Sequence, residues 1–96
     1  MDERLAGLPG ADLVERGLAD LAAGRESVPA LLVLVGAPRL RALGLAVPSG
    51  PSTGGEGPEH GLYALLAAED SDSAHSRYNA LVRRLVSFER AAECAG

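Results

Sequence analysis

The side chains best suited to chemistry gather in one short stretch, HSRYNALVRRL, which occupies positions 75 to 85. A helix would spread this stretch over about three turns. Imidazole, amide, phenol and guanidinium groups can bind anions, hydrogen-bond a small ligand or transfer protons. The candidate binding residues are His75, Arg77, Tyr78, Asn79, Arg83 and Arg84.

Helical spacing divides this stretch into an apolar face and a polar face. Tyr78, Leu81 and Leu85 share the apolar face, and most of the polar residues lie opposite. Arg77 and Arg84 are seven residues apart and share one flank. The pattern therefore favours a solvated helix surface, and a patch on this flank that binds an anion or a protein partner is the functional alternative.

A second alternative uses the border between the two faces. His75 and Asn79 are four residues apart and lie near this border. Together with Tyr78 and Arg83, they could surround a pocket where helices meet, which would make the chain a small-molecule-binding or catalytic helical domain.

Several other chemistries find no support in the sequence. All nine basic residues are arginine, so the chain has no P-loop lysine and no Schiff-base lysine. The single Cys94 cannot form an internal disulfide, and no cysteine or histidine has the spacing of a zinc site. Gly55 and Gly57 resemble a phosphate-binding loop, but His60 replaces its third glycine. No catalytic residue, metal or cofactor is therefore predicted.

The composition limits the partners. A net charge of −4 and an aromatic content of 3% argue against nucleic acid, which is bound through basic surplus and base stacking. The longest apolar run, at 28–37, is too short to cross a bilayer. The N-terminus has no apolar core of signal-peptide length. We therefore expect a cytoplasmic protein that does not enter a membrane, and the abundance of Ala, Gly and Arg suggests a bacterial source.

Two segments in the first half of the chain have helical signals. Residues 11–24 combine helical periodicity with Asp12 and Glu15 at capping-box spacing, and Gly24 would end the helix. Gly17 interrupts this helix and suggests a close crossing with another helix. Residues 27–45 are ambiguous, because a short apolar run is compatible with either a helix or a buried strand.

We favour two short helices for residues 27–45. In this interpretation Ser27 caps the first helix, Gly36 ends it, and Pro38 and Gly44 bound the second. The alternative is an α/β fold with a buried strand near 30–36. No second segment has the pattern of a strand, and a strand without a partner would leave its backbone groups unbonded.

The second half of the chain begins with a loop and ends with a long helix. Residues 47–58 are rich in Pro, Gly and Ser and predict a flexible loop. A helix should follow from 58 to 69, then a turn over 69–73, then the longest helix over about 73–94. The last helix carries an apolar seam with strict four–three spacing, extended on one flank by Val82 and Val86. The seam residues are Ala74, Tyr78, Leu81, Leu85, Phe88, Ala92 and Ala95.

These observations predict one helical domain over 1–96, an all-α bundle of four to five helices with a long C-terminal helix. A seam of this length is more than a short chain can easily cover, so part of it could be buried against another chain. The function we expect is that of a small protein–protein interaction or accessory module. It would act as a homodimer or with a different protein partner, and the 73–94 helix would contribute to the interface.

Overall fold

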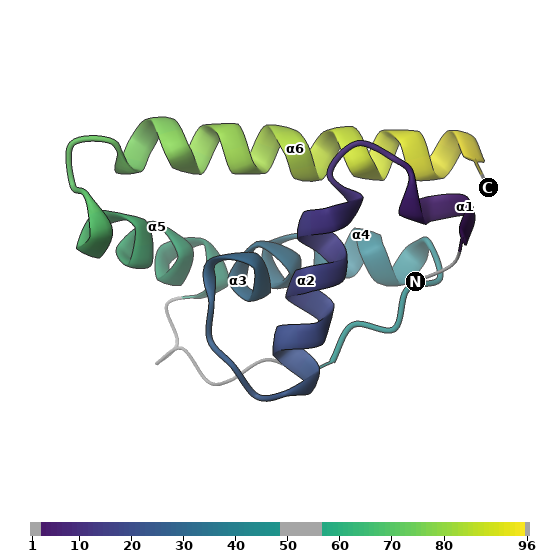
Figure 1. The fold of residues 1–96 in the computed structure, drawn as a ribbon, viewed down its shortest axis with the longest axis horizontal. Helices are drawn as coiled ribbons and strands as arrows, with labels where there is room; N and C mark the ends of the chain where they lie inside the picture. The colour runs from purple at the N-terminus through teal and green to yellow at the C-terminus, as the bar shows by residue number, and fades with distance from the viewer. Residues whose placement is uncertain (1–2, 49–56, 96) are drawn as a thin grey trace.

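The computed structural model describes residues 3–48 and 57–95, and within these ranges it contains helices and no strand (Figure 1). One short helical turn is followed by five helices. The helices are α1 Glu3–Ala6, α2 Ala11–Ala22, α3 Val28–Val35, α4 Ala37–Ala42, α5 Gly57–Glu69 and α6 Ala74–Ala95. The predicted all-α class is confirmed, and the strand proposed as an alternative near 30–36 is wrong.

The segment 27–45 is helical because its local signals agree with one another. The side chain of Ser27 accepts a hydrogen bond from the backbone N–H of Ala30 at 3.2 Å, which caps α3. Pro38 lies in the first turn of α4, where its missing N–H is tolerated. Gly44 follows α4 with φ 97°, a left-handed conformation that favours glycine. The two short helices predicted here are confirmed.

α2 and α3 pack closely where Gly17 faces the first turn of α3. Gly17 is buried, and a Cβ atom built on it would overlap the backbone oxygen of Pro29 and the side chain of Val33. Only glycine fits this crossing, which confirms the close approach inferred from the sequence. The contact holds α2 against the most completely buried segment of the chain, in which Leu31, Leu32 and Val33 have no exposed surface.

α6 runs along the long axis of the molecule, with α5 alongside its N-terminal half and α2 running crosswise to it (Figure 1). It contacts α5, α3, α2 and α1, and its seam is covered by these elements. Leu85, Phe88 and Ala92 are buried, with Phe88 fully inaccessible. Its own chain therefore covers most of the seam, but Tyr78 and Leu81 are half-buried, and Ala95, which was assigned to it, is exposed.

Four details differ from the sequence-based expectation. The N-cap of α2 is Gly10, with no side-chain cap, so the capping box proposed for Asp12 and Glu15 is wrong. The turn α1 carries no periodic signal and was not expected. Val47, assigned to the flexible loop, is buried, and its carbonyl accepts a hydrogen bond from Arg41 at 3.0 Å. Gly57, at the other end of that loop, begins α5. The flexibility predicted for the rest of the loop concerns 49–56, which lie outside the described residues.

The burial of Phe88 leads to a stability prediction. Phe88→Ala should lower the free energy of unfolding by about 3–5 kcal/mol, because it removes a fully buried aromatic ring and leaves a cavity. Urea denaturation followed by circular dichroism measures this change. Ser87→Ala, at the exposed neighbouring position, is the control and should change stability by less than about 0.5 kcal/mol. Equal effects of the two variants would contradict the burial of Phe88.

The close crossing at Gly17 predicts an effect opposite to helix propensity. Alanine is the better helix former, but Gly17→Ala should destabilise the protein by about 1–3 kcal/mol because the added methyl group has no space. Gly7→Ala is the control, since no atom lies within 4 Å of the added Cβ there. A Gly17→Ala protein as stable as the parent in thermal unfolding would show that α2 and α3 do not approach this closely.

Candidate functional site

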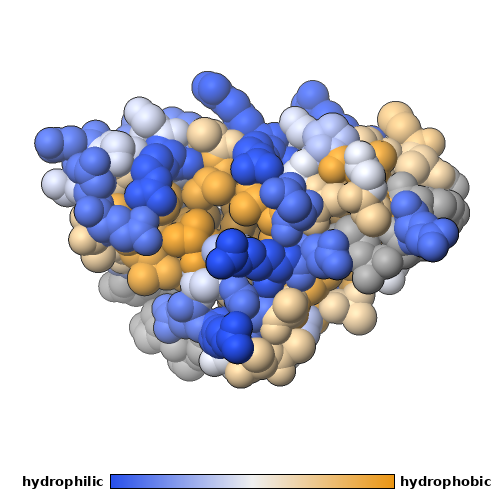
Figure 2. Space-filling model, in the orientation of Figure 1, coloured by the Kyte–Doolittle hydropathy of each residue, from blue (hydrophilic) through white to orange (hydrophobic). Residues whose placement is uncertain are grey.

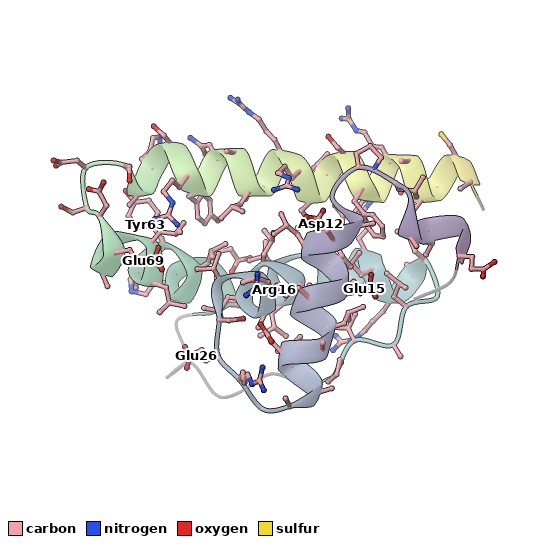
Figure 3. The ribbon with its side chains drawn as sticks, in the orientation of Figure 1. Asp12, Glu15, Arg16, Glu26, Tyr63 and Glu69 are labelled. Atoms are coloured by element: carbon pink, nitrogen blue, oxygen red, sulfur yellow. The ribbon has the colours of Figure 1, made fainter. Side chains whose placement is uncertain are left out.

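The candidate residues on α6 separate onto two flanks of the helix. Arg77 pairs with Glu69 of α5 at 2.8 Å, and Arg84 pairs with Asp12 of α2 at 3.2 Å. Figure 3 shows Asp12 at the end of α2 nearest α6 and Glu69 at the end of α5. The arginine flank is thus engaged in exposed ion pairs that link α6 to its own neighbours, and such pairs contribute little to stability.

The opposite flank carries His75 and Asn79. The amide nitrogen of Asn79 lies 3.2 Å from Nε2 of His75, which is a hydrogen bond between exposed and half-buried side chains one turn apart. Arg83 lies further round the helix, is exposed, and forms no ion pair within the part of the chain that the structure describes. These three residues therefore share one side of α6, away from Arg77 and Arg84.

Tyr78 belongs to the core side of α6 instead. Its ring packs against Tyr63 of α5, with ring centroids 5.8 Å apart and an interplanar angle of 56°. Tilted aromatic pairs of this kind stabilise packing beyond the area that they bury. Tyr63 remains 39% exposed. Hydrophobic side chains reach the surface between α5 and α6, bordered by hydrophilic ones (Figure 2).

An open groove of about 290 Å³ lies between α6 and the junction of α3 with α4. Its lining is almost entirely apolar, with charged side chains only at one end. The lining residues are Val35, Gly36, Pro38, Arg39, Val82, Leu85, Val86 and Glu89. None of the six candidate residues lines it. The predicted extension of the seam by Val82 and Val86 is present, but these side chains are half-buried and form one wall of the groove.

Glu89 closes one end of the groove and is the one buried charged residue among those that the structure describes. Its side chain is 5% exposed, and its nearest cation is Nη1 of Arg39 at 3.9 Å. Arg39 makes its closer contacts with Glu93, at 2.7 Å and 2.9 Å. Burial raises the pKa of Glu89 above its ordinary value of 4.5, with a smaller increase from Glu93, and the charge of Arg39 opposes this rise.

Glu89 and the groove were not found by sequence analysis, although one signal was present. Glu89 follows Val82 by seven residues and Val86 by three, so helical spacing places it on the same flank as these apolar residues. A carboxylate at such a position is a departure from the pattern. The position of α4 opposite this flank depends on tertiary packing and has no local signal.

The described residues contain no group of three or more His, Cys, Asp or Glu side chains that could hold a metal ion. Cys94 is exposed and free. None of the described helices has both the length and the apolar character that a bilayer crossing requires. What the fold and the site define together is a small all-α domain with an open apolar groove that ends at a buried carboxylate.

The chain was compared with known protein families, curated proteins and solved structures. No protein-family model matches the chain, and neither a curated protein nor a solved structure is detectably similar to it.

Because its pKa is raised, Glu89 should lower the free energy of unfolding as pH rises. A carboxyl group with a higher pKa in the folded state binds more protons there, so its contribution to stability falls as pH rises from 4.5 through the folded pKa. Glu89→Gln removes this loss, because the amide resembles the protonated acid. Compared with the parent, the variant should therefore gain stability as pH increases from about 3 to about 7, across the usual range of carboxyl titration.

Urea denaturation at a series of pH values measures this difference. Glu15→Gln on the exposed face of α2 is the matched control for the loss of one surface carboxylate. A difference between parent and Glu89→Gln that stays constant with pH would contradict the burial of an ionisable carboxylate at the end of the groove.

Proposed function

We propose that this protein is a small cytoplasmic interaction module that docks a helix of another protein chain into the groove beside α6. The observation that carries the proposal is the groove itself, since Val82 and Val86 present apolar surface that no helix of the described chain covers. An apolar groove of this kind fits the apolar face of an amphipathic helix.

The charged residues around the groove favour an amphipathic helix as its occupant rather than a fully apolar ligand. Glu89 and Arg39 at one end can accept and donate hydrogen bonds, so they could fix the direction and register of an occupant. The ion pairs of Arg77 and Arg84 lie on the other flank of α6 and leave this side open. An accessory module that binds a larger protein and a module that binds its own copy both use the same surface.

Association should depend on Val86. Val86→Glu places a charge in the apolar wall of the groove, so it should abolish association while the helix content stays that of the parent. Sedimentation velocity measures the mass of the protein alone from micromolar to millimolar concentration, and again after co-expression with proteins encoded beside it. Ser87→Glu is the control, because it adds the same charge at the next, exposed position.

Measurement of the protein alone detects binding of a second copy, and measurement after co-expression detects binding of a different protein. Complexes that Val86→Glu disrupts and Ser87→Glu leaves intact support the groove as the docking surface, whether the partner is a second copy or another protein. Complexes that tolerate both variants, or no complex in either setting, would contradict the proposal.

A further inference from the structure

α6 carries a second row of residues, each one position after a member of the buried seam. Its members alternate in four–three spacing, which is the spacing of a helix–helix interface. The row consists of His75, Asn79, Val82, Val86, Glu89 and Glu93. Val82 and Val86 form its apolar centre and line the groove. The remaining members are polar, so both ends of the row carry hydrogen-bonding groups.

The polar ends of this row are complementary to each other. The N-terminal end has His75 and Asn79, which can donate hydrogen bonds, and the C-terminal end has Glu89 and Glu93, which accept them. Residues at equal distances on either side of Arg84 form three pairs. His75 is then matched with Glu93, Asn79 with Glu89, and Val82 with Val86.

We propose that the occupant of the groove is a second copy of this chain, in which the two α6 helices lie antiparallel about a two-fold axis at the level of Arg84. This proposal rests on the function proposed above and names its partner. Val82 of each copy packs against Val86 of the other, and the polar pairs close both ends of the interface. A two-fold axis makes every contact occur twice, as in most homodimers.

The surroundings of Glu89 favour this arrangement. Its carboxylate lines the groove, receives no hydrogen bond from the described residues, and has its nearest cation at 3.9 Å. A largely buried carboxylate that still reaches the groove can accept a hydrogen bond from an occupant. The amide of Asn79, which bonds only to His75 within the described chain, would supply that donor from the second copy.

The charges also select the antiparallel direction. In a parallel pair each residue would face its own counterpart. The two copies of Glu89 would then meet in an apolar groove, and the two copies of Glu93 would meet beside them. Like charges placed together in this way are strongly unfavourable. A helix rotates by about 100° per residue, which places Arg83 and Arg90 on the outer side of the row. In the antiparallel pair both arginines therefore stay in solvent.

The strength of association tests the interface. Asn79→Glu would place a carboxylate opposite the buried Glu89 of the second copy, and the dissociation constant from sedimentation equilibrium should rise about tenfold or more. Ser76→Glu is the matched control, since it adds the same charge at an exposed position of α6 outside the row and should leave the constant unchanged. A dimer with equal sensitivity to both variants would overturn this interface.

Disulfide crosslinking tests the direction, in a Cys94→Ser background that removes the native thiol. A mixture of Val82→Cys and Val86→Cys proteins should form a mixed disulfide dimer under mild oxidation, and far more of it than either variant forms alone. The reverse result would indicate parallel helices and overturn the proposal. A parent protein that is monomeric at all concentrations would also overturn it. The docking function would still stand if a complex with another protein depends on Val86.

Discussion

The rest of the structure depends on the packing of the α6 seam against its own chain. Phe88 is the only phenylalanine, and among the described residues it is the largest side chain without exposed surface; Leu85 and Ala92 beside it are also buried. A helix of 22 residues gains most of its stability in water from such tertiary burial. Because α5, α3, α2 and α1 all contact this one helix, its seam helps to fix where each of them lies, together with the contacts of α3 with α2 and α5.

A core made mainly of Leu, Val and Ala can be filled only if the helices approach closely, and glycines permit this at three places. Gly17 allows α2 to meet α3, and a Cβ on Gly10 would lie 2.7 Å from the carbonyl oxygen of Arg84 in α6. At Gly36 the added atom would lie 2.9 Å from Leu85. Gly17, which weakens α2 locally, and Gly10 and Gly36 at helix ends therefore all serve the close packing of small side chains.

Features that depend on local interactions could be predicted from the sequence, and features that depend on contacts between distant segments could not. Ser27 and Gly44 act on their own turns, and the seam around Phe88 repeats with the helical period, so the helices and their buried face could be predicted. Asp12 was misassigned because a carboxylate near a helix start can cap the helix or pair across the fold, and here it pairs with Arg84. Only the three-dimensional arrangement decides between these roles.

The candidate site was predicted less well, because a groove is a property of two elements that are distant in sequence. The polar residues of 75–84 were rightly placed on α6, but the fold divides them between two flanks and puts the groove beside Val82 and Val86. Nothing local to α6 indicates that α4 stands opposite this flank. The one detectable anomaly was a charged residue, Glu89, on the flank that Val82 and Val86 share.

Under the proposed docking function, the buried Glu89 connects stability with recognition. An apolar side chain at position 89 would complete the wall formed by Val82 and Val86 and would avoid the penalty that burial places on a carboxylate. It would also remove the hydrogen-bond acceptor from that end of the groove and leave Arg39 as the charged side chain of the lining. We interpret Glu89 as a residue that lowers the stability of the isolated chain and gives the groove a direction. The same logic explains the position of Arg39, which stays close enough to offset the charge of Glu89 but makes its hydrogen bonds to Glu93. The carboxylate is thereby tolerated in the folded chain, and in the proposed complex it would accept a hydrogen bond from the occupant.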